Sequence, residues 1–175
     1  MLKLRTIISR KVEEMNTILD EFLELKEILN SFNGLEKKYN WLLTDLDWSY
    51  PENYLDYFEV YREFKESDRQ NNYWITGDKL MQLAINKEVH FMWSVFSAFE
   101  KNETIDLDEF IVEPYADGNP NLWDENPKIQ HPKAIVELVF WDSSLILLLS
   151  EDNTFSKNFR NTFHGWKDLN SYNQS

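Results

Sequence analysis

The chain has 175 residues with a formal net charge of −13, 42% hydrophobic and 15% aromatic residues, and no cysteine. The absence of cysteine excludes disulfides and thiolate catalysis, and the aromatic content is too high for a disordered acidic chain. Residues 1–11 carry four basic residues and no acid, so taking their +4 from −13 leaves −17 on the rest. Such a field repels nucleic acid and anionic lipid and favours a cationic partner.

The chain contains no candidate for a membrane anchor or a signal peptide. Its longest apolar run, residues 145–149, is far shorter than the roughly 18 residues that cross a bilayer. The basic N-terminus lacks an apolar region before the charges resume at Glu13. We therefore expect a cytoplasmic protein. Its length suits one domain and no linker divides it, so residues 1–175 are predicted to form a single domain.

The first predicted element is a long helix over residues 12–32. Apolar residues recur there every three or four positions, from Met15 through Phe22 to Phe32, and acidic residues fill the other face. Asn33-Gly34 supplies its C-terminal turn. We expect this helix to lie across a sheet, because three heptads are marginal for a coiled coil. Residues 2–9 fit an edge strand and the first turns of the same helix equally well.

The next stretch is predicted to alternate strands and helices. β-favouring residues predict a strand over 38–48. Residues 52–66 fit a helix or a strand, and Pro51 followed by Glu52 favours the helix. A short strand over 72–75 is followed by a short helix with Thr76 as its N-cap.

Residues 89–99 show the clearest alternation in the chain. The pattern places Val89, Phe91, Trp93, Val95 and Phe99 on one face of a strand, with Phe96 and Ala98 among the residues of the other.

Residues 103–127 are unusually acidic. They contain eight Asp and Glu residues, and no Lys or Arg lies between Lys101 and Lys128. Residues 110–112 suggest a strand. Residues 114–123 then contain Asp-Gly and Asn-Pro turn signals and predict a long ordered loop. Long loops within a domain are often functional.

Residues 134–150 predict a β-hairpin at the centre of the sheet. Two runs that are apolar on both faces meet at Asp142-Ser143-Ser144. Glu137, the only charge in the first strand, must reach an edge or find a buried partner. Asp152 is the expected N-cap of a final helix, whose Phe155, Phe159 and Phe163 lie on one face.

These elements define an α+β fold. We predict a mostly antiparallel sheet of about five or six strands, with a long N-terminal helix and a C-terminal helix packed on it.

Three segments carry a resemblance to a known family: residues 114–120, 129–132 and 141–144. There the sequence resembles uncharacterised small proteins of Bacillus-like Gram-positive bacteria, a domain of unknown function. The similarity runs from about Tyr73 to the C-terminus. The family has no assigned activity, so the resemblance implies only a bacterial intracellular protein.

No motif in the sequence indicates catalysis, a metal or a cofactor. Ser143 and Ser144 lie on a strand–turn–strand, without the Gly-x-Ser-x-Gly of a nucleophile elbow. The three histidines are isolated, and the oxygen ligands near Asp117 do not match an EF-hand. Glycine-rich phosphate loops are absent. We therefore expect no catalytic residue, no metal site and no cofactor.

The remaining hypothesis is protein binding. Acid-rich loops with interleaved aromatic residues suit a basic protein, because aromatic residues supply contact area and acids steer association. We predict a non-catalytic binding module of immunity or inhibitor type. Its candidate surface comprises Tyr115, Asp117, Asn119, Trp123, Asp124, His131 and Asp142. The alternative function is a hydrolase that uses paired carboxylates in the 113–131 region. The simplest interpretation is that the acidic loop is a solvated surface that binds no partner.

Overall fold

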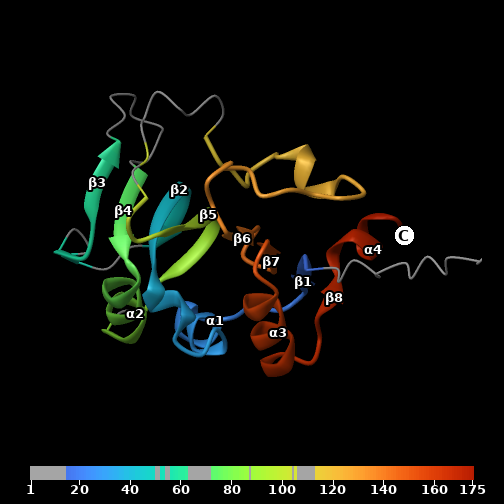
Figure 1. The fold of residues 1–175 in the computed structure, drawn as a ribbon, viewed down its shortest axis with the longest axis horizontal. Coiled ribbons are helices and arrows are strands. Elements are labelled where there is room, and N and C mark those ends of the chain that lie inside the picture. The colour runs from blue at the N-terminus through green and yellow to red at the C-terminus, as the bar shows by residue number, and fades with distance from the viewer. Residues whose placement is uncertain are drawn as a thin grey trace, which may run out of the picture.

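The computed structural model is an α+β fold built on one antiparallel sheet (Figure 1). It describes residues 15–49, 52–53, 56–62, 72–86, 88–103, 105 and 113–175. The sheet order is β3-β4-β2-β5-β6-β7-β1-β8. The described strands are β1 (Thr17–Leu19), β2 (Tyr39–Ser49), β3 (Glu59–Arg62), β4 (Asn72–Thr76), β5 (His90–Glu100), β6 (Val136–Trp141), β7 (Leu145–Ser150) and β8 (Lys167–Asp168).

The predicted sheet was too small. Eight strands replace the five or six expected, because short segments at both ends of the chain add strands beyond the hairpin. β1 pairs with β7 on one side and with the two-residue β8 on the other. The predicted hairpin at the centre of the sheet is confirmed, since β6 pairs with β7 and both have neighbours on either side.

The long N-terminal helix predicted over residues 12–32 is wrong. In its described part, residues 17–19 form β1 and helix α1 covers only Leu25–Ser31. Thr17 and Ile18 are β-branched, and every residue of β1 is buried against strands. Pairing with β7 outweighs the helical pattern, because a helix of this length is not stable unless its apolar face packs against other elements. The predicted element at residues 2–9 lies outside the described residues.

The helix favoured over residues 52–66 is wrong in the described part of that segment, because it contains a strand. Residues 59–62 form β3, which pairs with β4. The predicted strands over 38–48 and 72–75 are confirmed as β2 and β4. The predicted strand at residues 110–112 lies outside the described residues.

Helix α2 (Gly77–Asn86) is confirmed at the position predicted after Thr76, whose Oγ1 accepts from the Lys79 N–H at 3.4 Å. Its first residue must be glycine because the backbone of η1 (Leu35–Lys38) approaches closely. A Cβ built on Gly77 would lie 1.9 Å from the Glu36 carbonyl oxygen.

The Glu36 side chain is itself buried, and this burial raises the pKa of its carboxyl.

Strand β5 is confirmed, but its predicted faces are wrong at the start. Relative to β2, the register shifts between Thr44 and Asp47 and again between Asp47 and Trp48. Such bulges change which side a residue faces. Phe91 therefore packs in the same core as Phe96, whereas Trp93 packs on the other face with Val95.

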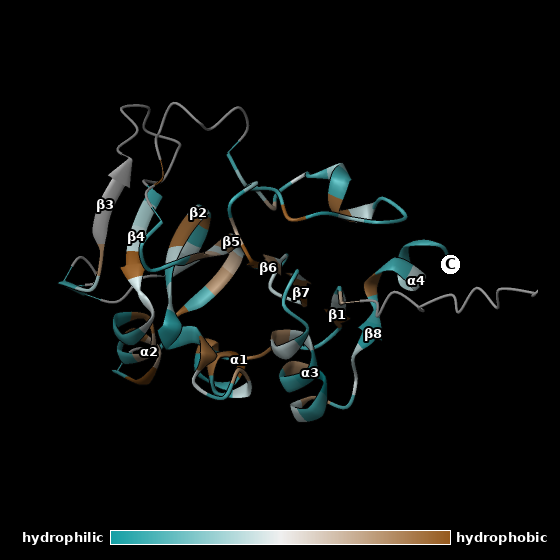
Figure 2. Ribbon diagram, in the orientation of Figure 1, coloured by the Kyte–Doolittle hydropathy of each residue, from teal (hydrophilic) through white to brown (hydrophobic). Residues whose placement is uncertain are grey.

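The two faces of the sheet are covered differently. Helices α1, α2 and α3 (Asn153–Thr162) bury one face in a large apolar core (Figure 1). On the opposite face, residues 113–131 and helix α4 (Leu169–Asn173) contribute Ala116, Leu122 and Leu169 to a smaller core. Figure 2 shows hydrophobic colour in strands β2, β4 and β5 and in α1, whereas the segment over 113–131 is largely hydrophilic.

The C-terminal helix forms as predicted. The Asp152 carboxylate caps α3 by accepting from the Thr154 N–H at 2.7 Å, and Phe155 and Phe159 are fully buried. Arg160 donates to the Thr17 hydroxyl at 2.9 Å and so ties α3 to β1. In the described part of the chain, no helix has the length and apolar character needed to cross a membrane.

Candidate binding surface

Residues 113–131, here called the loop platform, cover the sheet face opposite the three helices. They include the 3-10 helix η4 (Pro120–Trp123) and otherwise lack regular structure. Few of their residues are apolar and buried: Ala116 and Leu122 are the main ones. Hydrogen bonds therefore matter for its position: some come from strands β2 and β6, and others come from Asn16, from Asn173 of α4 and from within the platform itself.

Strand β2 anchors the start of the loop platform. The Thr44 hydroxyl donates to the Pro114 carbonyl at 2.6 Å. The Asp45 carboxylate accepts from the Ala116 N–H at 2.6 Å and from the Asp117 N–H at 2.9 Å. Asp45 lies at the β2 bulge with φ of 51°, a conformation that Asp tolerates better than most residues. Sequence reasoning missed this residue, although an acid inside an apolar strand was the available signal.

Asn119 holds the middle of the loop platform. Its Nδ2 donates to the Tyr115 carbonyl and to Gln130 Oε1, both at 2.9 Å, and its Oδ1 accepts from the Asn121 N–H at 3.0 Å. Gln130 Oε1 also accepts from the Tyr115 N–H at 3.0 Å. Asn119 is 1% exposed, so this predicted binding residue is buried and positions the loop.

Glu137 anchors the end of the loop platform from strand β6. Its Oε2 accepts from the Gln130 N–H at 2.8 Å, and its Oε1 accepts from the His131 N–H at 2.9 Å and from the Ser97 hydroxyl at 3.2 Å. The side chain has no exposed surface. Burial raises the pKa of Glu137 to about 7, although these donors oppose the shift. The sequence predicted that Glu137 needs an edge or a buried partner, and the backbone of the loop platform supplies the partner.

His131, another predicted binding residue, is also buried rather than exposed to solvent. It is 2% exposed, its ring lies edge-on to Phe99 with centroids 4.9 Å apart, and its Nδ1 accepts from the Lys133 N–H at 3.2 Å. Two of the seven candidate residues, Asn119 and His131, therefore support the loop from inside the protein.

Three half-buried tryptophans, one from the loop platform and two from the strands, form a cluster. Trp123 of η4 and Trp93 of β5 each lie edge-on to Trp141 of β6, with centroids 4.8 Å apart in both pairs. The sequence singled out only Trp123. The other two come from neighbouring strands, and their meeting depends on the pairing of β5 with β6.

Two exposed carboxylates directly follow tryptophans of this cluster in the chain: Asp124 follows Trp123, and Asp142 follows Trp141. Asp117 and Asp124 are exposed on the loop platform, and Asp142 is exposed directly after Trp141.

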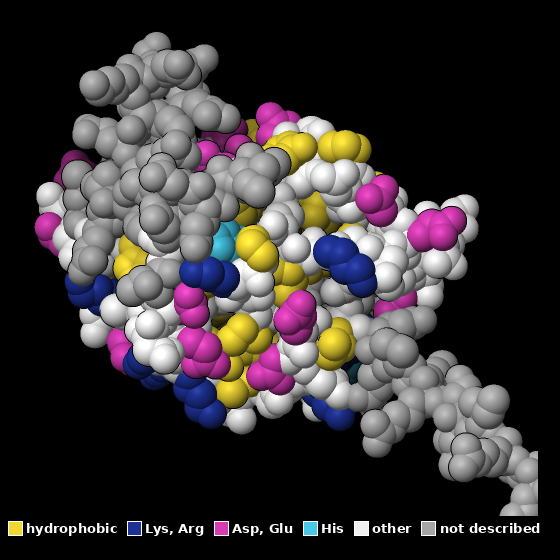
Figure 3. Space-filling view, turned by 45° about the horizontal axis from the view of Figure 1, so that its top comes forward, with side chains coloured by type: hydrophobic (Ala, Val, Ile, Leu, Met, Phe, Trp, Pro, Cys, Tyr) yellow, Lys and Arg dark blue, Asp and Glu magenta, His cyan; other side chains and the backbone are white. Residues whose placement is uncertain are grey.

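Asp142 and Ser143 both have positive φ, as a type I′ hairpin turn requires. The Asn173 amide donates to the Asp124 carbonyl at 2.7 Å and fixes that corner. Tyr115 is half-buried. In the view of Figure 3, acidic, basic and hydrophobic side chains are interspersed over the visible face.

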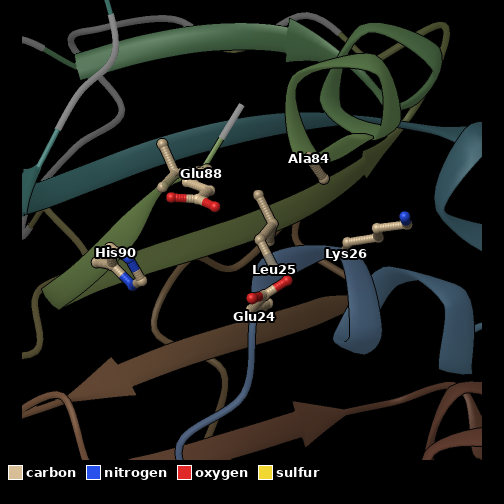
Figure 4. Close-up of a pocket in the computed structure, with 7 residues that line it drawn as sticks. Glu24, Leu25, Lys26, Ala84, Glu88 and His90 are labelled. Carbon is tan, nitrogen blue, oxygen red and sulfur yellow. The ribbon is translucent and has the colours of Figure 1, made fainter. Parts of the chain in front are cut away.

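The hydrolase alternative needs a cleft with two carboxylates in the 113–131 region, and neither of the two small clefts found among the described residues is lined by that region. These two clefts, one of which is drawn in Figure 4, are lined by residues within 22–26, 84–91 and 140–146. The fully buried carboxyl of Glu137 is sealed beneath backbone donors. Among the described residues, no three His, Asp or Glu side chains gather in a way that would hold a metal ion.

The chain matches no protein-family model, no curated protein and no solved structure. The resemblance to small proteins of Bacillus-like bacteria therefore stays a prediction.

Proposed function

We propose that this protein is a non-catalytic, cytoplasmic binding protein of immunity or inhibitor type that takes a basic protein partner. Its contact surface would be the tryptophan cluster together with Tyr115, Asp117, Asp124 and Asp142. The proposal includes a bacterial origin and excludes nucleic acid and membranes as partners.

One observation supports the proposal most. Three half-buried tryptophans contact one another, exposed Asp124 and Asp142 directly follow two of them in the chain, and hydrogen bonds from two strands hold the loop that carries Trp123. Tryptophan is enriched at the centres of protein interfaces, and exposed acids steer a cationic partner toward them. A loop that is already ordered loses little conformational entropy on binding.

Affinity capture from a bacterial lysate at low salt tests the proposal. We expect the wild-type protein to retain a basic protein, and added salt, Asp117→Ala or Trp123→Ala to weaken retention. Glu151→Gln, which removes an exposed acid outside the surface, is the matched control. Trp123→Phe preserves an aromatic ring should alanine unsettle the loop. Retention that responds to neither salt nor the surface variants would contradict the proposal.

A further inference from the structure

Glu137 is an enclosed acid that neutral groups hold against the end of the loop platform. Its side chain has no exposed surface, and its register partners on the neighbouring strands are Ser97 of β5 and Leu149 of β7. The N–H groups of Gln130 and His131 and the Ser97 hydroxyl donate to its carboxylate, and all three donors are uncharged. Ionisation of a carboxyl in such a place costs more hydration than these donors restore, so burial raises its pKa to about 7.

Gln130 connects this buried acid to the rest of the loop platform. Its backbone N–H donates to Glu137 Oε2 at 2.8 Å. Its side-chain Oε1 accepts from the Tyr115 N–H at 3.0 Å and from the Asn119 amide at 2.9 Å. A movement that takes the Gln130 residue away from Glu137 therefore also breaks the bonds to Tyr115 and Asn119.

The other anchor of the loop platform does not pass through Gln130. The Ala116 and Asp117 N–H groups donate to the Asp45 carboxylate of β2, at 2.6 and 2.9 Å. These two bonds share no group with Glu137. The loop platform thus has two separate anchors, and a change in the charge of Glu137 acts directly on only one of them.

The charged and titratable groups beside Glu137 come from the platform side, since β5 and β7 contribute neutral residues at this register. His131 Nδ1 accepts from the Lys133 N–H, so that nitrogen carries no proton. Lys133 forms an ion pair with Glu103 at 3.1 Å, and the two side chains are 35% and 36% exposed. His131 is therefore the neighbour whose titration must be separated from that of Glu137.

We propose that Glu137 is a pH-dependent release for one end of the loop platform: as pH rises, its ionised carboxylate favours hydration, and the segment that carries Gln130 and His131 opens more often. At lower pH the neutral carboxyl can donate its proton to the Ser97 oxygen while it still accepts from both platform N–H groups. This inference goes beyond the proposed function, because the opening needs no partner.

The direction follows from linkage. The closed loop platform binds the Glu137 proton more tightly than an open one, in which the carboxyl meets water and regains its ordinary pKa of 4.5. The advantage of the closed state is therefore complete below pH 4.5 and is lost as pH rises through about 7. Local opening is expected at such a loop well before global unfolding.

Hydrogen exchange at single amides, followed by nuclear magnetic resonance from about pH 5.5 to about pH 8, tests the proposal. The quantity compared is the protection factor, which removes the intrinsic pH dependence of exchange. We expect protection at Tyr115, Gln130 and His131 to fall by about twentyfold over this range. Ala116 and Asp117 are the internal control, and their protection should change by less than about threefold.

Glu137→Gln removes the titrating group and keeps the size of the side chain. Protection at Gln130 and His131 should be lower in this variant, because an amide has one acceptor oxygen fewer, but it should not depend on pH. Lys133→Ala, which removes the charge of the nearby ion pair, is the matched control and should keep the wild-type dependence on pH. Should Glu137→Gln fail to fold, the comparison of the two anchors in the wild-type protein still decides.

Three results would overturn the proposal. A dependence on pH that persists in Glu137→Gln would assign the titration to His131. An equal fall in protection at Ala116 and Asp117 would show that the loop platform opens as one unit. Protection at Gln130 that stays constant with pH would show that ionisation of Glu137 does not open the loop. Each measurement uses the protein alone, so this proposal and the proposed function fail separately.

Discussion

The two faces of the sheet are stabilised by different kinds of interaction, apolar packing on one and a larger share of hydrogen bonds on the other. The helix-covered face is an apolar core, in which Phe32, Trp41, Phe155 and Phe159 are fully buried. The loop-covered face has a smaller apolar core, and much of its order comes from hydrogen bonds to buried or half-buried acids of the strands, Asp45 and Glu137. Apolar packing tolerates many sequences, whereas the hydrogen-bonded face depends on a few named side chains.

This difference separates stability from function in the molecule. The helix-covered core supplies most of the buried apolar area and therefore most of the hydrophobic stabilisation. The loop platform contributes less of that area but fixes where exposed acids and tryptophans lie. Damage to the helix-covered core should unfold the whole protein, and damage to the polar anchors should mainly loosen the loop.

The largest expected loss of folding stability follows from shortening a buried side chain in the helix-covered core. Phe155 is fully buried between Phe32 and Tyr39, with ring centroids 5.0 and 5.6 Å away. Phe155→Ala should lower the free energy of unfolding by about 4 kcal/mol, because the lost contacts leave a cavity. Urea denaturation followed by circular dichroism measures this change. A loss below about 2 kcal/mol would show that the core relaxes around the gap.

Gly77→Ala should come next, with a loss of roughly 3 kcal/mol. The added Cβ would overlap the Glu36 carbonyl, so α2 and η1 must move apart. Gly118→Ala is a useful comparison, because its Cβ would meet no atom within 4 Å but its φ of 68° strains any other residue. Urea denaturation should rank Gly77→Ala as the more damaging variant, and the reverse order would contradict the close approach.

Glu137→Gln should alter how stability depends on pH. The folded-state pKa is raised from 4.5 to about 7. The folded state therefore binds the proton more tightly, and this contribution to stability is complete below pH 4.5 and is lost as pH rises through 7. The wild-type free energy of unfolding, minus that of the variant, should fall by about 3 kcal/mol across this window. A difference that stays flat would contradict the raised pKa.

Asp45→Ala should have the smallest effect on stability, about 1–2 kcal/mol. It removes the acceptor for the Ala116 and Asp117 N–H groups. Asp45→Asn is the matched control, because asparagine tolerates positive φ and keeps an acceptor oxygen. The loss, again measured by urea denaturation, should be clearly smaller in Asp45→Asn. Equal losses would indicate that the charge of Asp45, rather than its hydrogen bonds, holds the loop.

The sequence predicted elements where a local pattern agreed with the final packing. The apolar runs at 134–150 predicted the central hairpin, and Asp152 with Phe155 and Phe159 predicted α3. The prediction failed at residues 17–19, where the helical spacing of Met15, Ile18 and Phe22 competed with strand pairing. β1 lies between β7 and β8, and no local pattern reveals partners more than 120 residues away.

The candidate surface was predicted in part for a similar reason. Acidity and turn residues correctly drew attention to the loop, and Asp117, Asp124 and Asp142 are exposed. The sequence could not distinguish Asn119 and His131, which are buried, from the exposed residues beside them, because both types are polar. Asp45, Trp93 and Trp141 were missed because they reach the loop platform only through the register of the sheet.

Hydrogen exchange at single amides tests the central claim most directly, namely that strand acids hold the loop platform in one place. We predict slow exchange at Ala116, Asp117, Gln130 and His131 in the wild-type protein. Asp45→Ala should accelerate exchange at Ala116 and Asp117 by about tenfold or more while the amides of β6 and β7 keep their protection. Fast exchange at all four amides in the wild-type protein, or no change in the variant, would contradict the account.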